Sequence, residues 1–256
     1  MKYYTPLALL LWAYVSLWFL ISLFKRRNDV ADVAWGLGFV LVAWTSFFLA
    51  GGSSGTRGVL VCILVSVWGV RLAWHIQARH RGKAEDFRYM AWRREWGKWF
   101  YARSYAQVYL LQGALLFIVV SPVLMINRST GTTFGFLNGM GACIWLFGFL
   151  FESVGDAELA RFARDPHNRG KILQSGLWRY TRHPNYFGEV VQWWGIWVVA
   201  VGVPGDWFSI VGPLTISLLI LKVSGIPMLE KKMAENPDFA EYRRRTSVFI
   251  PWVPKR

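Results

Sequence analysis

The sequence is short of charged residues, of acidic residues and of cysteine, and each shortage excludes a class of protein. Only 17% of its 256 residues are charged, against roughly a quarter in soluble domains, so an ordinary soluble enzyme is not expected. The two cysteines, Cys62 and Cys143, both lie in apolar stretches, which excludes a disulfide framework or a metal site built from them, and we expect no bound metal. Acidic residues number 15 against 29 Lys and Arg, which leaves a net charge of +14.

Apolar and aromatic residues are abundant instead. Hydrophobic residues make up 54% of the chain, with 16 Trp and 18 Phe, and the mean hydropathy is +0.30, so a disordered chain is excluded. Seven apolar stretches are long enough for a helix to cross a ~30 Å hydrocarbon layer, at about 5–24, 33–50, 58–76, 105–126, 134–152, 185–203 and 207–226. Such long apolar runs argue against a nucleic-acid-binding protein despite the positive charge. The sequence therefore predicts an all-α integral membrane protein with seven transmembrane helices.

The positions of the positive charges predict the orientation of these helices. All Lys and Arg except Lys2, Arg57 and Arg128 lie in alternate connections or in the C-terminal tail. Since positive charge stays on the cytosolic side, the N-terminus is predicted outside and the C-terminus in the cytosol, with membrane lipid as a partner. No repeat or linker divides the chain, so a single domain over 1–256 is expected.

The segment from Glu152 to Trp194 is the most informative part of the chain. Glu152 and Asp156 are one helical turn apart, and a basic loop then leads to a helix that begins at His183-Pro184. From there one helix face carries Asn185, Glu189, Gln192 and Trp193. A carboxylate near the centre of a membrane helix costs roughly 2.5–3.5 kcal/mol. Glu189 is therefore expected either to pair with Arg179 or Arg182, or to line a polar cavity that binds a ligand.

The basic cluster between helices has two interpretations. Its members are Arg161, Arg164, Arg169, Lys171, Arg179 and Arg182. They can hold anionic lipid headgroups, at about 1 kcal/mol per charge, or grip the phosphates of a ligand. The neighbouring carboxylates would be unfavourable in a lipid site and favour a specific ligand.

Polar residues near the second and third apolar stretches form a second candidate group: Asp32, Arg71, His75 and Tyr89. Arg71 lies within an apolar run, so a partner such as Asp32 is expected. That pair would either lock two helices together or serve catalysis. His75 is either a proton donor or a solvated residue at the interface.

The run from Gly176 to Glu189, GLWRYTRHPNYFGE, resembles the C-terminal signature of the steroid 5α-reductase superfamily. The Asp32-Val-Ala-Trp-Gly, Arg71-Leu-Ala-Trp-His and Arg245-Thr-Ser-Val-Phe-Ile-Pro segments resemble its poorly characterised bacterial branch. The resemblance implies a multi-helix reductase of the bacterial inner membrane that holds NADPH in a cytosol-facing cavity. It also implies a lipophilic substrate with a carbon–carbon double bond conjugated to a ketone.

The resemblance places the cofactor segment at about 152–252. The residues expected to bind the cofactor are Glu152, Asp156, Arg164, Arg169, Lys171, Tyr180, Arg182, His183, Asn185, Tyr186 and Glu189. Glu152 stands where steroid reductases have Asn. Their Gln-Glu pair in helix 2 and Tyr in helix 3, which bind the substrate ketone, are absent here, so Asp32, Arg71, His75 and Tyr89 are the catalytic candidates.

Two other functions remain open from the sequence. The Arg-His-Pro-x-Tyr-x-Gly core is similar to that of isoprenylcysteine carboxyl methyltransferases, which bind S-adenosylmethionine. The basic loop 161–171 favours NADPH, because a pyrophosphate and a 2′-phosphate need more cations than a methyl donor without phosphate. A transporter or lipid-binding scaffold is the third hypothesis, although the apolar stretches lack the repeat symmetry typical of transporters.

Overall fold

The computed structural model describes residues 2–130, 134–203 and 205–255. Every regular element in these residues is helical, and their β pairing amounts to one isolated bridge between Thr181 and Ser247. This confirms the predicted all-α class. The chain forms two compact units, Met1–Gly135 with Ala200–Gly212, and Phe136–Val199 with Pro213–Arg256. The single domain expected from the sequence stays a prediction.

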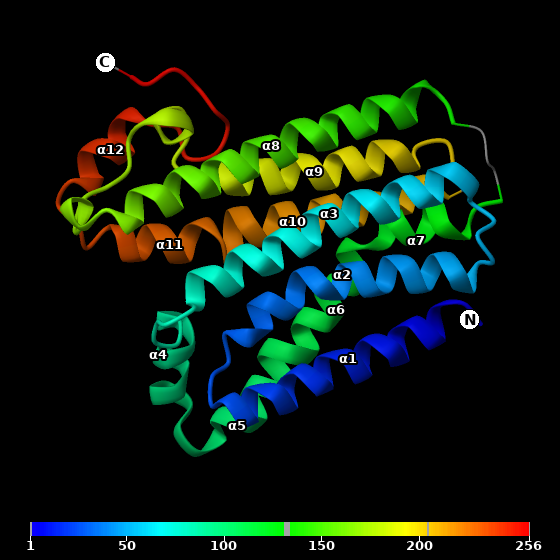
Figure 1. Ribbon diagram of the computed structural model, residues 1–256, viewed down its shortest axis with the longest axis horizontal. Coiled ribbons are helices and arrows are strands. Elements are labelled where there is room, and N and C mark those ends of the chain that lie inside the picture. Colours follow the sequence, from blue (N-terminus) through cyan, green and yellow to red (C-terminus); the bar gives the residue numbers. More distant parts are fainter. Residues whose placement is uncertain (1, 131–133, 204, 256) are drawn as a thin grey trace. The chain divides into compact units, whose positions relative to one another are not determined.

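The first unit contains most of the N-terminal helices (Figure 1). In chain order they are α1 (Tyr4–Lys25), α2 (Val30–Leu49), α3 (Gly55–His80), α4 (Phe87–Trp96), η1 (Gly97–Trp99), α5 (Phe100–Arg103), the π-helix η2 (Ser104–Leu110), α6 (Leu111–Val119), α7 (Ser121–Arg128) and η5 (Asp206–Ile210). The helices α2 and α3 cross closely, because a Cβ added to Gly36 would lie 2.5 Å from the carbonyl oxygen of Gly69. Small residues allow such contacts between membrane helices.

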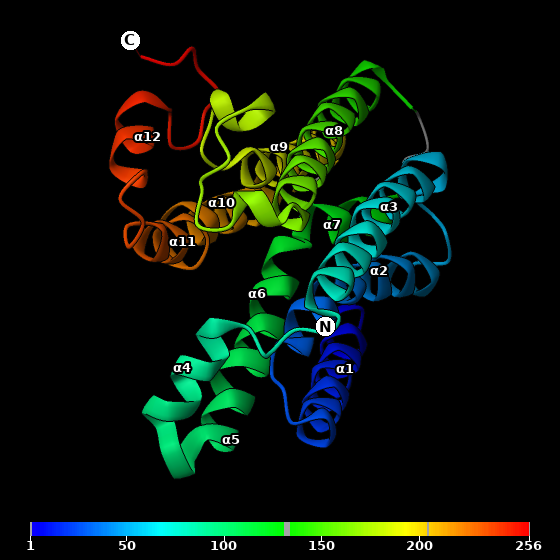
Figure 2. The same cartoon turned by 60° about the vertical axis from the view of Figure 1, so that its left-hand side comes forward.

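The second unit is built on two long helices (Figures 1 and 2). Its elements are α8 (Phe136–Arg164), η3 (Pro166–Asn168), η4 (Gly176–Arg179), α9 (Pro184–Ala200), α10 (Val211–Leu218), the π-helix η6 (Leu219–Val223), α11 (Ile226–Met233) and α12 (Phe239–Arg245). The last residue of α9 and the first two of α10 belong to the first unit. The start of α9 at Pro184 confirms the predicted helix boundary.

Glycines bring α8 and α9 into backbone contact. A Cβ added to Gly148 would lie 2.6 Å from the carbonyl oxygen of Gly188, and a Cβ added to Gly141 would lie 2.6 Å from that of Gly195. These glycines recur every seven residues on both helices, so one face of α8 meets one face of α9 along a continuous seam. This close contact determines which polar side chains of the two helices can meet.

Five described helical segments are long and apolar enough to span a membrane: Tyr4–Lys25, Val30–Leu49, Gly55–His80, Phe136–Arg164 and Asp206–Met233. A sixth span is possible if Phe87–Val119 and Ser121–Arg128, which meet at a 50° bend, cross together. The α9 helix, at 17 residues, is shorter than the ~20 residues of a typical span. The protein is thus an integral membrane protein, while the count of seven and the orientation stay predictions.

Candidate functional site

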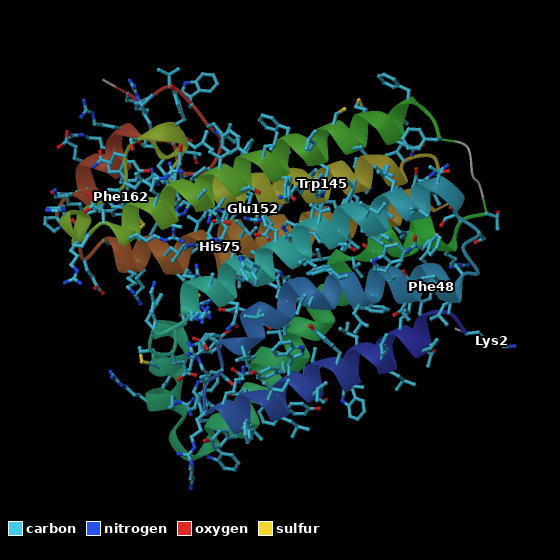
Figure 3. The ribbon with its side chains drawn as sticks, viewed as in Figure 1. Lys2, Phe48, His75, Trp145, Glu152 and Phe162 are labelled. Atoms are coloured by element: carbon cyan, nitrogen blue, oxygen red, sulfur yellow. The ribbon has the colours of Figure 1, made fainter. Side chains whose placement is uncertain are left out.

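The face of α9 predicted to be polar contacts α8 through two pairs of side chains, which we call the amide–carboxylate cluster. Gln192 Nε2 donates to Glu152 Oε2 at 2.5 Å, and both residues are buried. One turn further along α8, Asp156 Oδ1 accepts a hydrogen bond from Asn185 Nδ2 at 3.1 Å. Figure 3 labels Glu152 on α8. The glycine seam brings the helices close enough for these short amides to reach the carboxylates.

Gln192 retains an unused acceptor in this cluster. Its Oε1 atom is buried and has no hydrogen-bond partner among the described residues. Burying a polar atom without a partner is costly, so such an atom points to a missing donor. A ligand amide or hydroxyl can supply that donor.

A second network joins the start of α9 to α11 and the C-terminal tail. Arg182 Nε donates to Glu230 Oε1 at 2.7 Å, and Arg182 Nη1 donates to the carbonyl oxygens of Arg243, at 3.0 Å, and Thr246. The ring nitrogen Nε2 of His183 lies 3.2 Å from the same Glu230 oxygen. Both Arg182 and His183 are almost fully buried, at 5% and 1% exposed. Their side chains therefore hold the fold together, and phosphate binding is better assigned to more exposed cations.

The tail is also tied to the signature run by its backbone. The Arg182 amide donates to the Ser247 carbonyl oxygen at 2.9 Å, and the Trp252 amide donates to that of Tyr180 at 2.9 Å. Tyr242, whose hydroxyl donates to the Trp178 carbonyl oxygen at 2.6 Å, is buried, and burial raises its pKa. Glu230 and Tyr242 were expected in a tail that either anchors at the membrane surface or closes over the cytosolic mouth, and they were not among the predicted site residues. An acid that directly follows an apolar stretch, in an otherwise basic tail, is the signal that could have found Glu230.

Five cations between the last turn of α8 and the start of α9 remain exposed: Arg161, Arg164, Arg169, Lys171 and Arg179. Within the part of the chain that the structure describes, their side chains form no hydrogen bond or ion pair. Asp165 in the same connection accepts hydrogen bonds from the backbone and ring of His167, which lower the pKa of its carboxyl. The connection therefore offers uncompensated positive charge to an anionic ligand.

Three further cofactor candidates, Tyr180, Tyr186 and Glu189, belong to the signature run from Gly176 to Glu189. Glu189 is half-buried, and both interpretations of it, an ion pair with Arg179 or Arg182 and a place in a ligand cavity, stay predictions. The ring of Tyr186 stacks on that of His183 with centroids 5.7 Å apart. Tyr180 is 42% exposed, which leaves its ring accessible to a ligand.

The first unit holds a different group, which we call the arginine–carboxylate cluster. Its members are Arg27, Asp29, Asp32, Glu85, Asp86, Arg88, Tyr89 and Arg93. Arg88 Nη2 donates to Asp32 Oδ2 at 2.6 Å, and its Nε donates to Asp86 Oδ1 at 2.9 Å. The hydroxyl of Tyr89 donates to Asp32 Oδ1 at 2.7 Å. The structure thus brings together Asp32 and Tyr89, two of the four catalytic candidates.

Two carboxylates of this cluster, Asp29 and Asp86, are held in their ionised form. Burial raises the pKa of Asp29, but the bidentate bonds from Arg27, at 2.7 Å each, and the Asp86 amide outweigh it and lower the pKa. Burial likewise raises the pKa of Asp86, but the hydrogen bonds and charge of Arg88, together with the charge of Arg79, outweigh it and lower the pKa. Arg93 pairs with Glu85 at 3.2 Å. Each carboxylate therefore has an arginine beside it.

The other two catalytic candidates, Arg71 and His75, lie one turn apart on α3 and are half-buried. Figure 3 labels His75 on this helix. The pairing of Asp32 with Arg71 stays a prediction. The sequence reasoning missed Arg88, although Asp86 caps α4 by accepting the Arg88 amide and so places Arg88 and Tyr89 in its first turn.

Apolar helices, an amide–carboxylate cluster and exposed cations beside it define a membrane protein with a candidate anion-binding site in its second unit. The chain belongs to the family described as protein of unknown function (DUF1295), which matches residues 18–246. An uncharacterized protein of Schizosaccharomyces pombe is 24% identical over 200 residues, which covers 68% of this chain and 57% of that protein.

Named relatives also match. The protein called 3-oxo-5-alpha-steroid 4-dehydrogenase 1 is 28% identical in Rattus norvegicus and 33% in Bos taurus, over 44% of this chain and 40% and 41% of theirs. The chain thus spans about half the length of the curated relatives it matches. No solved structure matches the chain. These relatives confirm the resemblance to the steroid 5α-reductase superfamily.

Proposed function

We propose that the protein is a membrane-embedded reductase that uses NADPH to reduce a carbon–carbon double bond conjugated to a ketone in a lipophilic substrate. The observation that carries this proposal is the set of unpaired cations in the same unit as the amide–carboxylate cluster, in a chain related to proteins named as steroid dehydrogenases. By the predicted topology, this face opens to the cytosol of a bacterial inner membrane. When bound, NADPH supplies the hydride for such a reduction.

The donor set of the second unit fits this cofactor. Arg164, Arg169 and Lys171 are exposed on one connection and are suited to the pyrophosphate and the 2′-phosphate. Asn185, fixed by Asp156, and the half-buried Glu189 would orient the nicotinamide end. The methyltransferase alternative is not favoured, because S-adenosylmethionine carries no phosphate for these cations.

The catalytic candidates would act on the substrate ketone. Its oxygen gains negative charge during the reduction, so a preorganised hydrogen-bond donor or cation near that oxygen lowers the barrier. The Tyr89 hydroxyl donates its single proton to Asp32, so it would have to give up that bond to donate to the ketone. Arg71 and His75 are the other candidate donors. These roles stay predictions.

Cofactor titration of the purified full chain in nanodiscs tests the proposal. We expect NADPH to bind, and Arg169→Ala and Lys171→Ala to weaken it about tenfold each, which corresponds to about 1.4 kcal/mol per lost phosphate contact. At least one of these variants should affect NADH less, because NADH lacks the 2′-phosphate. Asn185→Ala and Glu189→Ala should weaken both nucleotides alike.

The matched control is Arg94→Ala, which removes an exposed cation from α4 in the first unit. It should leave the affinity for NADPH unchanged, and thermal unfolding should confirm that every variant is folded. Binding of S-adenosylmethionine without binding of NADPH would overturn the proposal. Equal affinities for the loop variants and Arg94→Ala would also contradict it.

A further inference from the structure

A pocket in the first unit is lined by no residue of the cofactor segment. It has a volume of about 350 Å³ and lies where α1 ends, α2 begins and α3 ends. Its walls include Lys25, Arg27, Val30, Val33, His80 and Arg81. This volume falls within the range of roughly 300–1,000 Å³ that is usual for small-molecule sites. The pocket can therefore hold a ligand the size of a lipid headgroup.

The uncompensated charge around the pocket is positive. Arg27 is paired with Asp29, and the other acids nearby are bound by Arg88 and Arg93. Lys25 and Arg81, from the ends of two different helices, are exposed and form no ion pair in the described chain. Two such cations that line one pocket from different helices favour an anion as its ligand.

His80 adds a polar group with unused hydrogen-bonding capacity. Its side chain is 12% exposed, and its Nδ1 lies 3.7 Å from Asp29 Oδ2. Its Nε2 is buried without a hydrogen-bond partner among the described residues. Buried polar atoms are usually satisfied, so this atom indicates a partner supplied from outside the chain. A phosphate oxygen or a headgroup hydroxyl can satisfy it, according to the tautomer of the ring.

The apolar surroundings favour an amphiphile over a free ion. Val30 and Val33 form a buried wall of the pocket. The last turns of α1 expose Leu20, Leu23 and Phe24, by 59%, 36% and 90%, on a helix long and apolar enough to span the membrane. An acyl chain can follow this surface while its phosphate remains at the end of the helix. Basic side chains near the cytosolic membrane surface attract anionic lipids.

We propose that this pocket binds the phosphate group of an anionic phospholipid through Lys25, Arg81 and His80. The site is distinct from the proposed reductase site, because none of the residues that line the pocket is a catalytic candidate or belongs to the cofactor segment. Its occupancy would tie the ends of α1, α2 and α3 to the lipid surface. The same phosphate chemistry could come from a free phosphate ion, and the experiment separates the two sources.

Lipid binding to the detergent-solubilised full chain is measured by native mass spectrometry with added phosphatidylglycerol or phosphatidylcholine. The double variant Lys25→Ala/Arg81→Ala is compared with Arg94→Ala/Lys98→Ala, which removes the same charge from exposed positions in the first unit. We expect the pocket variant to bind phosphatidylglycerol at least tenfold more weakly than the wild type. The control variant should match the wild type, and phosphatidylcholine should bind weakly to all three.

His80→Phe keeps an aromatic ring and removes both ring nitrogens. It should weaken binding of phosphatidylglycerol while the thermal unfolding of the lipid-free protein stays unchanged or rises, because a buried unpaired atom is lost. Equal binding by the pocket variant and the control variant would overturn the proposal. Thermal protection by inorganic phosphate as strong as that by phosphatidylglycerol would overturn the assignment to lipid. NADPH titration of the same variants keeps this result distinct from that of the reductase proposal.

Discussion

The two polar clusters of the molecule hold their carboxylates in different ways. In the arginine–carboxylate cluster, arginines bind Asp29, Asp32, Glu85 and Asp86 at distances of 2.6–3.2 Å. In the amide–carboxylate cluster, neutral amides of Gln192 and Asn185 bind Glu152 and Asp156. An arginine both orients a carboxylate and compensates its charge, whereas an amide only orients it.

The comparison shows that the two units use their charged side chains differently. The first unit uses its arginines to join segments far apart in the sequence, such as Asp32 at the start of α2 and Arg88 in α4. The second unit brings its long helices together along a glycine seam, where backbone atoms come close. The cations that follow α8 are exposed, and we propose that they bind a ligand. We therefore expect substitutions in the first cluster to affect stability most, and substitutions in the loop to affect binding.

Arg88→Ala is expected to lower thermal stability the most, because it disrupts the arginine–carboxylate cluster. It leaves Asp32 and Asp86 without their shared guanidinium, and removing one partner of a largely buried ion pair costs about 3 kcal/mol. Thermal unfolding in detergent should show a fall of several degrees. Arg94→Ala, on the exposed side of the same helix, is the control and should unfold like the wild type. An unchanged unfolding temperature for Arg88→Ala would mean that the cluster does not stabilise the unit.

Gly188→Ala should break the amide–carboxylate cluster without removing any polar group. An added Cβ would lie 2.5 Å from the backbone nitrogen of Glu152 and 2.5 Å from the carbonyl oxygen of Gly148, so α9 must move away from α8. Such overpacking costs about 2 kcal/mol, and the displacement should also weaken NADPH binding. Gly139→Ala is the matched control, since nothing lies within 4 Å of the added atom. If both variants unfold at the same temperature, the seam does not set the contact between the helices.

Much of the fold could be predicted because hydropathy and turn chemistry are local. The apolar stretches, the start of α9 at Pro184 and the polar face with Asn185 and Gln192 follow from the chain itself. The end of α8 was predicted near 152, yet the helix continues to Arg164. Polar residues beyond a membrane span can extend the same helix, and hydropathy marks only the apolar part.

The partners of the charged residues could not be predicted, because they depend on how distant segments meet. Arg182 was one of two arginines considered as a partner of Glu189, and the structure shows that it binds Glu230, 48 positions away. Asp32 was expected to meet Arg71 on the adjacent helix, and the structure adds Arg88 and Tyr89 from α4. Sequence spacing places a side chain on a face but does not determine which of several cations reaches it.

Acid titration tests whether arginines stabilise the ionised carboxylates of the arginine–carboxylate cluster, and its expected effect is the smallest of the three. The pKa values of Asp29 and Asp86 lie below the ordinary value of 3.8, so the folded state favours their ionised forms. Their contribution to stability is complete above about pH 4 and is lost as the pH falls through the lowered pKa values. The unfolding temperature of the wild type should therefore drop more steeply below pH 4 than that of Asp29→Asn. Asp165→Asn, at a fully exposed carboxyl beside His167, is the control and should keep the wild-type slope, because exposed ion pairs contribute little. Parallel curves for the wild type and Asp29→Asn would show that the bonds from Arg27 do not stabilise the ionised carboxylate.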